Sequence, residues 1–532
     1  METNRIFKYI FAAVVIGLIG YAVIIFVSNR SIETTEVLDQ TSTVNNIQTD
    51  LRFAIAGYDT INPLISNNRN VQEITKIIYD PLVTLDENYK LEYCLAESIE
   101  KQDATHYLIK LKKGVLWNDN QELTAFDVKF TFDKILLGGF RNIYQSNLEY
   151  VTDLAIVDNG NNDSLIVTLS REVPFFEYYL TFPIMCEHYY EGEDFATSEK
   201  APIGTGMYKI ESIEATRIKL VKNPTYWNSN KTPMANEIYV NLYGTIGEVY
   251  NAFKSGDIDI MLVGNSNIEQ YIGSLGYNRI EFKSRDYDFL TLNCLDPNLQ
   301  NPKMRKALSL ILDKNALIAA CLGEGYVSSN FPLDYGEWLY TRDLGVETNH
   351  DEAKKLITEC GWQERNNGWI IHDGRNTVRL NFTITVNNDS EERVRVAENI
   401  KEQFEGFGID VDIRYLTRDK YIDALSNKNY QIIVTGVETS YTPNLATYFG
   451  SGNIANYENE EVLGIIGEAT SGASDDRLYE IYNRLYDIYL EEAPYIGLYR
   501  KTQNLISNQS LVGNLKPNAF NMYHNIELWY RQ

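Results

Sequence analysis

The chain has 532 residues, 44% of them hydrophobic and 23% charged, which is typical of a globular protein with a sizeable core. This length predicts two or three structural units, because single cores stop growing near ~250–300 residues. A net charge of -25 argues against nucleic acid or an anionic membrane surface as the partner, since both attract clustered Lys and Arg.

An apolar segment near the N-terminus predicts a membrane anchor. From Tyr9 to Asn29 the chain has no charged side chain, and a helix of that length covers about 30 Å, the thickness of the hydrocarbon layer. Arg5 and Lys8 precede this segment, so the positive-inside rule keeps the N-terminus in the cytoplasm. Residues 1–30 are therefore expected to form a single-pass anchor or signal anchor, with the main body outside the cell membrane.

A cleaved signal peptide is the alternative, and the body is exported in either case. The segment is longer than the apolar core of a signal peptide, which has roughly 7–15 residues, and its exit at Ile25–Arg30 lacks an Ala-x-Ala site. No cysteine precedes Cys94, so lipid attachment near the membrane is not expected. The polar stretch 31–50 predicts a flexible tether.

The residue types that carry chemistry form no local pattern of an enzyme or a metal site. The sequence has no C-x-x-C pair, no H-E-x-x-H, no G-x-S-x-G and no phosphate-binding glycine loop. Five scattered cysteines in a large exported chain do not predict a disulfide framework. We therefore expect no catalytic residue, no metal and no cofactor.

Folded structure is expected to start with the alternating strand Leu51–Ala56, and strands and helices then mix along the first half. A helix is predicted over about 71–79, and a helix after Thr124 begins with a capping box that pairs Thr124 with Asp127. The other predicted elements of this half are the strands at 106–112, 115–117, 204–210 and 258–263 and the helix at 247–254.

The second half alternates strands and helices in a βαβαβ order. A long amphipathic helix is predicted over Pro302–Leu322, closed by Gly323. Further strands are predicted at 380–386, 408–415, 430–435 and 495–499, and further helices at 390–404, 421–426 and 475–490. This order predicts an α/β fold in which helices cover a mixed sheet.

Several segments resemble, in order, the family 5 extracellular solute-binding proteins of bacterial ABC importers. These proteins include the oligopeptide- and dipeptide-binding type. The matching segments are 58–64, 79–83, 95–98, 112–117, 124–128, 204–208, 223–227, 256–259, 304–308, 313–314, 456–457 and 493–496. Met207 stands where the family usually has Pro. The resemblance covers about 51–529, nearly all of the exported part.

This resemblance implies a bilobal periplasmic-binding-protein-like (type II) fold with an extra inserted domain. The first lobe would combine 51–88, 200–284 and 492–532, the inserted domain would span 89–199, and the second lobe 285–491. A ligand would sit in the cleft between the lobes, which close around it by a hinge motion near Arg285 and Glu492. The implied protein is a monomer that binds and does not catalyse.

The resemblance also implies where the ligand binds. In peptide-binding relatives an Asp that follows a Gly-Trp pair holds the α-amine of the peptide. Here the matching stretch is 436–443, with Val437 in place of Trp and Ser440 near the place of the Asp. The candidate ligand-binding residues are Tyr58, Asp59, Thr60 and Asn62 on the first lobe and Asn387, Asn388, Glu438, Thr439, Ser440 and Tyr441 on the second.

Departures from the family pattern bear on the ligand. The dipeptide-binding branch uses an Arg for the ligand carboxylate where this chain has the neutral Asn387 or Asn388, so a longer peptide or a neutral solute fits better than a dipeptide. Glu438 is the candidate anion for the amine. The expected partners are a peptide or other small polar solute and an ABC permease in the membrane. The alternatives are another solute, such as an oligosaccharide, a sensory or chaperone-like role without transport, or an extracellular hydrolase, which would need an acid pair or a nucleophile in the cleft.

Overall fold

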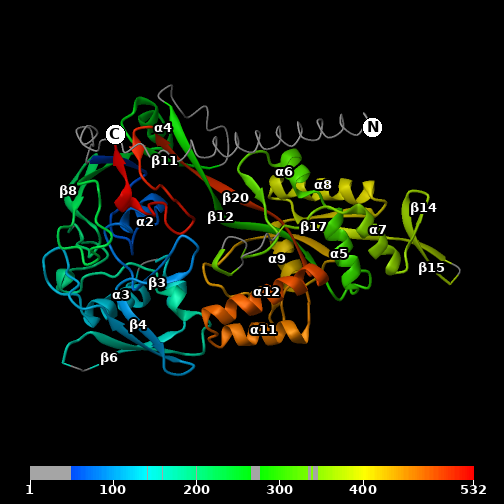
Figure 1. Cartoon of the computed structure of the whole chain (residues 1–532), viewed down its shortest axis with the longest axis horizontal. Coiled ribbons are helices and arrows are strands. Elements are labelled where there is room, and N and C mark those ends of the chain that lie inside the picture. The colour runs from blue at the N-terminus through cyan, green and yellow to red at the C-terminus, as the bar shows by residue number, and fades with distance from the viewer. Residues whose placement is uncertain are drawn as a thin grey trace, which may run out of the picture. The chain divides into compact units, whose positions relative to one another are not determined.

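The computed structural model describes residues 50–139, 142–157, 160–198, 200–264, 276–333, 337–339, 345–374 and 376–532 (Figure 1). The predicted anchor, 1–30, and all of the predicted tether except Asp50 lie outside these residues. In the part that is described, no helix has both the length and the apolar character needed to cross a membrane. The chain from Thr49 to Arg531 forms one compact unit.

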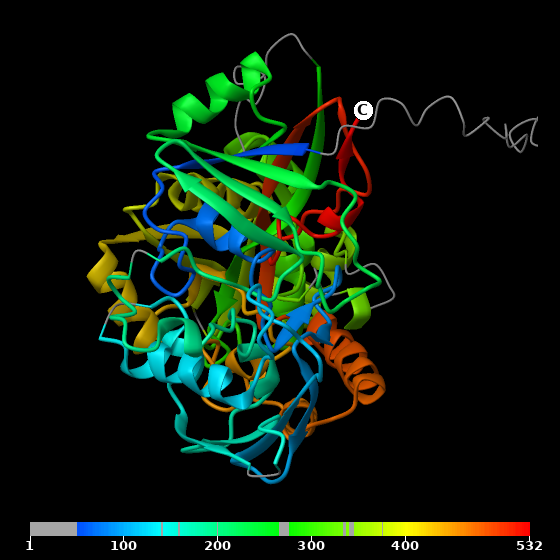
Figure 2. The ribbon, with the colours of Figure 1, turned by 90° about the vertical axis from the view of Figure 1, so that its left-hand side faces the viewer.

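The first sheet joins the start of the chain to a segment about two hundred residues later. β1 (Asp50–Ala56) pairs in parallel with β10 (Glu237–Tyr243), and β9 (Arg217–Lys222) and β8 (Tyr208–Glu214) follow in antiparallel order (Figure 2). Alternate residues of β1 are buried, as the sequence predicts for a strand with one face on the core. α4 (Ile246–Ser255) packs beside this sheet.

A second, antiparallel sheet lies between β1 and β8 in the sequence. Its order is β4 (Ala96–Lys101), β5 (His106–Leu111), β7 (Ser164–Leu169) and β6 (Val151–Ile156). α3 (Ala125–Leu137) begins with the predicted capping box of Thr124 and Asp127, which is thereby confirmed. The short elements of this part are β2 (Val83–Leu85), β3 (Leu91–Tyr93), η2 (Gln145–Leu148), η3 (Phe176–Tyr179) and η4 (His188–Tyr190).

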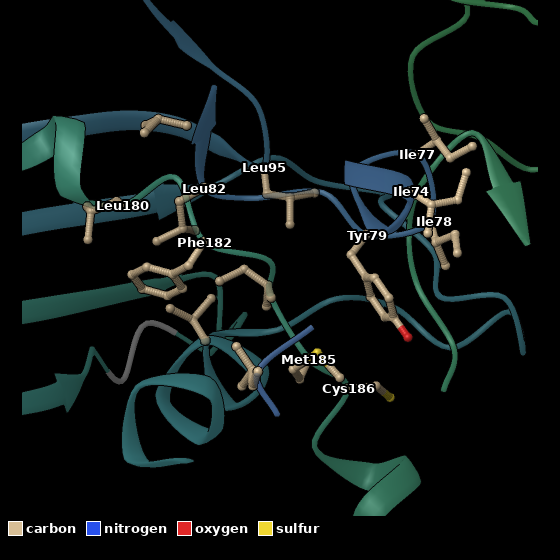
Figure 3. Packing of buried hydrophobic residues seen from close by; sticks show 14 of the residues in the cluster. Ile74, Ile77, Ile78, Tyr79, Leu82, Leu95, Leu180, Phe182, Met185 and Cys186 are labelled. Carbon is tan, nitrogen blue, oxygen red and sulfur yellow. The ribbon is translucent and has the colours of Figure 1, made fainter. Parts of the chain in front are cut away.

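These two sheets share one continuous core, which defines the first region of the molecule. Figure 3 shows Ile74, Ile78 and Tyr79 close to Leu95, Phe182 and Met185, although the two groups are distant in sequence. α2 spans Arg69–Thr75, so the helix predicted over 71–79 ends earlier than expected and Lys76 to Ile78 form turns. Tyr79, which follows these turns, is buried in the core.

A seven-stranded mixed sheet forms the centre of the second region, and apolar core clusters pack on both faces of this sheet. Its order is β11 (Ile260–Val263), β20 (Tyr495–Asn508), β12 (Tyr277–Leu292), β19 (Ile432–Glu438), β17 (Asn381–Asn387) and β18 (Asp410–Leu416), with β13 (Tyr326–Ser328) paired to β20. β17 pairs in parallel with both β18 and β19. The predicted mixed sheet of an α/β unit is confirmed.

Two long antiparallel strands, β12 and β20, run from one region into the other (Figure 1). At about 3.3 Å per residue each is roughly 50 Å long. Ile280 and Leu505 pack in the first region, whereas Leu290 and Leu498 pack in the second. The pairing register shifts between Lys283 and Tyr287, so the ladder is interrupted between the two cores.

Helices cover both faces of the seven-stranded sheet. They are α5 (Pro302–Ile311), α6 (Lys314–Cys321), α7 (His350–Glu359), α8 (Glu391–Gly406), α9 (Arg418–Ser426), α10 (Ala446–Phe449), α11 (Glu460–Thr470) and α12 (Asp475–Glu492). The remaining described elements are η6 (Glu337–Leu339), β14 (Gln363–Arg365), β15 (Gly368–Asp373), β16 (Asn376–Arg379), β21 (Leu511–Val512), η7 (Ile526–Leu528) and β22 (Tyr530–Arg531).

The prediction of one helix over Pro302–Leu322 is wrong. Leu312 has an extended backbone, with φ -76° and ψ 117°, and ends α5. Asp313 then caps a new helix, because its carboxylate accepts a hydrogen bond from the Ala316 amide at 2.8 Å. The break lets α5 and α6 follow different directions, with α5 packed on α7 and α12 and α6 on α8.

Candidate ligand-binding site

The strand order brings several predicted site residues to one edge of the seven-stranded sheet. Because β17, β18 and β19 are parallel, their carboxyl ends, at Asn387, Leu416 and Glu438, lie at the same edge. α8 and α9 begin within a few residues of β17 and β18. In open α/β sheets ligands bind outside the carboxyl ends of the strands, so this edge is the candidate ligand-binding site.

Glu438 lies at the end of β19 and forms an ion pair with Arg285, which comes from the register shift in β12. The Glu438 side chain is 63% exposed and that of Arg285 27%. The Arg285 guanidinium also donates to the carbonyl of Thr439 at 3.1 Å. This pair is one accessible charged feature of the edge.

Thr439 has a structural role in the same corner. It is buried, and both its amide and its hydroxyl donate to the Arg285 carbonyl, at 2.9 and 3.0 Å. The hydroxyl also accepts from Nη1 of the buried Arg500 at 3.2 Å. Thr439 therefore fixes the bulged backbone that carries Arg285.

Tyr441 extends from this corner to the first region. Its hydroxyl donates to the carbonyl of Ala519 at 2.6 Å, and its ring stacks on Tyr89 at 5.9 Å between centroids. The edge of Phe520 meets the same ring, and the Arg285 guanidinium lies 4.2 Å from its centroid. Tyr441 is thus a contact between the end of β19 and the C-terminal segment of the chain.

Ser440 and the two asparagines are more exposed. The Ser440 hydroxyl lies 3.1 Å from that of Thr442 and accepts from the Thr442 amide. Asn387 accepts from the Asp389 amide at 3.1 Å, and the Asn388 amide donates to Leu416 at 2.9 Å. Asn388 lines an open hollow of about 490 Å³ with Glu391, Val394, Arg395 and Tyr415.

The four candidates on the first region belong to one loop after β1, which is held largely by its own contacts. Asp59 accepts from the amides of Thr60 and Asn67 and from the Ser66 hydroxyl, at 2.7–3.1 Å. Asn62 is buried and accepts from the Leu64 amide at 3.0 Å.

The Thr60 hydroxyl accepts from the Asn62 amide at 3.2 Å, and burial raises the pKa of the half-buried Tyr58. These bonds give the loop a fixed shape, and its contact with a ligand stays a prediction.

A partly buried ion pair lies next to the edge, and the sequence pattern does not indicate it. Arg393 of α8 binds Asp288 of β12 through two hydrogen bonds of 3.0 Å, and the Tyr499 hydroxyl donates to the same carboxylate at 2.8 Å. Burial lowers the pKa of Arg393, but the Asp288 carboxylate raises it by more. Partners 105 residues apart leave no local signal in the sequence.

One cluster in the first region has the donor types of a metal site. Ligand atoms of Asp127, Cys186 and His188 lie within 4.8 Å of one another. Both Asp127 oxygens, however, already accept backbone hydrogen bonds, from Thr124 and Glu187 at 2.8 Å. The carboxylate is used as a helix cap, as the sequence predicts, and all five cysteines of the chain are free.

Comparison with known proteins identifies the family to which this architecture belongs. The family model described as bacterial extracellular solute-binding proteins, family 5 Middle, matches residues 90–456. The oligopeptide-binding protein AppA of Bacillus subtilis is 25% identical over 507 residues, which cover 90% of this chain and 91% of AppA.

Two solved structures show the same fold. The unliganded open form of the periplasmic murein tripeptide binding protein MppA has a TM-score of 0.75 at 16% identity, over 91% of this chain and 97% of MppA. A nickel ABC transporter structure from Bacillus halodurans has a TM-score of 0.73 at 20% identity, over 90% and 99% of the two chains. The chain therefore belongs to the family 5 extracellular solute-binding proteins of bacteria.

Proposed function

We propose that this protein captures oligopeptides outside the cell and delivers them to an ABC permease. The family supplies solute binding and no catalysis, and relatives such as the Bacillus subtilis protein are named for oligopeptide binding. The observation that carries the proposal is the accessible Glu438–Arg285 pair at the carboxyl edge of the sheet.

The ion pair offers a carboxylate that can change partner at small cost. An exposed pair of this kind contributes only about 0–1 kcal/mol. The α-amine of a peptide can therefore replace Arg285 at Glu438. Arg285 keeps its contacts with the Thr439 carbonyl and the Tyr441 ring when this happens.

The peptide backbone has a place beside the same carboxylate. β19 pairs with β17 only at Ile432 and Ile433, so its last residues pair with β12 alone among the described strands. An extended peptide next to Gly436–Glu438 can add main-chain hydrogen bonds, which give affinity without selecting side chains. This arrangement suits peptides longer than two residues.

Closure of the two regions over the peptide completes the mechanism. β12 and β20 connect the regions, and the register shift at 284–286 supplies a position where these strands can bend. A peptide that contacts both Glu438 and the loop Tyr58–Asn62 favours the closed state through those added contacts. The permease then recognises the closed form.

We propose the domain bounds, the membrane anchor and the ligand-site residues as well. The first lobe comprises 51–88, 200–284 and 492–532, the inserted domain 89–199, and the second lobe 285–491. Residues 1–30 anchor a monomer to the outer face of the cytoplasmic membrane. The ten candidate residues named from the sequence line the ligand site.

Glu438→Gln tests the proposal. We expect the variant to bind an oligopeptide with a free α-amine at least tenfold more weakly than wild type, because a charge-assisted hydrogen bond is lost. Its melting temperature should stay nearly unchanged, since the side chain is exposed. Titration calorimetry gives the affinity and calorimetric melting the stability.

The N-acetylated form of the same peptide is the control. It carries no α-amine, so wild type and Glu438→Gln should bind it with equal affinity. Equal affinity of the two proteins for the free peptide would remove Glu438 from the ligand site.

A further inference from the structure

A cavity of about 530 Å³ lies between the first and second regions, apart from the edge described above. One wall comes from β3, β4, β5 and the segment Phe175–Tyr178. The opposite wall is the turn between α11 and α12, from Ala469 to Leu478. This volume lies within the range of about 300–1,000 Å³ typical of small-molecule sites.

Aromatic rings form much of the first wall. Tyr93, Tyr107, Phe175 and Tyr178 all line the cavity, and Tyr93 is 44% exposed. Phe175 has φ 56° and ψ 38°, a left-handed backbone that is rare for a bulky residue. Strained backbone of this kind persists where surrounding contacts hold it, often at binding sites.

Glu177 adds a carboxylate to this aromatic wall. Four charged residues line the cavity, and two of them are lysines with their own partners: Lys90 pairs with Asp475 at 2.7 Å and Lys101 with Glu172 at 2.6 Å. Within the described ranges, no cation lies at ion-pair distance from Glu177. Burial raises its pKa, opposed in part by a hydrogen bond from its own backbone amide and, to a smaller extent, by Lys101.

Aromatic rings beside a carboxylate that has no cation at ion-pair distance among the described residues are the chemistry that binds organic cations. The faces of tyrosine and phenylalanine attract ammonium and guanidinium groups, most strongly when water is excluded. A cation beside Glu177 would also relieve the cost of burying that carboxylate. We propose that this cavity binds the basic side chain, lysine or arginine, of a peptide ligand.

The cavity adjoins the proposed peptide site, on which this inference rests for its natural ligand. A small apolar cluster of Leu85, Tyr89 and Phe520 has Leu91 and Tyr178 of the cavity packed against it, and Tyr441 as well. The cavity and the sheet edge thus flank the same cluster. A peptide held at the edge can extend past the cluster and place a side chain in the cavity.

The test uses two blocked tripeptides and the full-length protein. Acetyl-Ala-Lys-Ala-methylamide carries the cation without a free amine or carboxylate, so it does not need Glu438. Acetyl-Ala-norleucine-Ala-methylamide is its neutral match. We expect wild type to bind the lysine compound at least tenfold more tightly, as measured by ligand-detected NMR titration.

Two variants should abolish this preference by independent routes. Glu177→Gln removes the charge, and Ser471→Trp fills the cavity from the opposite wall, at an exposed residue. The control Glu149→Gln makes the same chemical change on the exposed surface of the first region, away from the cavity, and should keep the preference.

Equal binding of the two compounds by wild type, or an unchanged preference in both variants, would overturn the inference. Neither result would affect the peptide site at Glu438, which the free and N-acetylated peptides test separately.

Discussion

Gly436 shows how one residue shapes the sheet edge that we propose as the ligand site. A Cβ atom at this position would lie 1.7 Å from Nη2 of Arg393 and 2.0 Å from Oδ1 of Asp288. The ion pair therefore lies directly over the strand, in space that only glycine leaves free. This close approach of the ion pair explains why position 436, two residues before Glu438, is a glycine.

Gly436→Ala should destabilise the protein by about 3 kcal/mol, because the methyl group displaces a partly buried charge pair. Urea denaturation followed by circular dichroism measures the change. Gly464→Ala is the matched control: its Cβ would meet nothing within 4 Å, and it lies inside α11. Alanine there should stabilise by up to about 1 kcal/mol. Equal effects at both positions would contradict the role of Gly436.

His524 gives the first region a pH dependence. Burial is the main cause that lowers its pKa below the usual 6.5, and Lys231 adds to it. Below that value the unfolded chain takes up a proton before the native state does, so stability falls as the pH falls. Above pH 7 both states are neutral and the effect vanishes.

His524→Gln should therefore lose less stability than wild type between pH 7.5 and pH 5.5. Urea midpoints at the two pH values give the comparison, and most carboxylates stay ionised throughout this window. A fall of the same size in both proteins would show that His524 does not contribute.

At the scale of elements, local signals predicted most helices and strands but not their breaks. The capping box at Thr124 and the strand Leu51–Ala56 depend on neighbouring residues, and both predictions are confirmed. The break after Leu312 depends on a distant contact, because Gln403 of α8 bonds both the amide and the carbonyl of Asp313. A periodic apolar pattern continues through such a break and does not reveal it.

In the candidate site too, local sequence signals predict some features, while others depend on pairing between distant segments. Strand signals predict β17 and most of β19, whereas the resemblance to the family selects Glu438 and Asn387 as candidates just beyond these strands. Arg285 lies in a charged stretch of β12 that is typical of a loop, and its position depends on a register shift with β20. Sequence pattern alone cannot give that pairing.

The break between α5 and α6 also makes a prediction. Asp313→Ala should cost about 1 kcal/mol, since the Ala316 amide loses its capping partner. Asp412→Ala, at an exposed position of β18, should change stability by less than about 0.5 kcal/mol. Denaturant titration of both variants measures the difference. No effect at Asp313 would mean that other contacts alone maintain the break.

At the scale of the whole folded body, two strands connect the cores and the ligand edge lies beside their irregular point. Tyr441 with Ala519, and Lys90 with Asp475, are contacts between the first and second regions that form without a ligand. Phe175 also packs against the apolar cluster of the second region, and the ring of Tyr89 stacks on that of Tyr441. A ligand need supply only a few kcal/mol of added contacts to shift the population toward closure.

Small-angle X-ray scattering of the protein with and without a bound oligopeptide tests this claim most directly. We expect a smaller radius of gyration in the complex, because the peptide draws the two regions together around the sheet edge. An unchanged radius at a peptide concentration that saturates binding in calorimetry would contradict it.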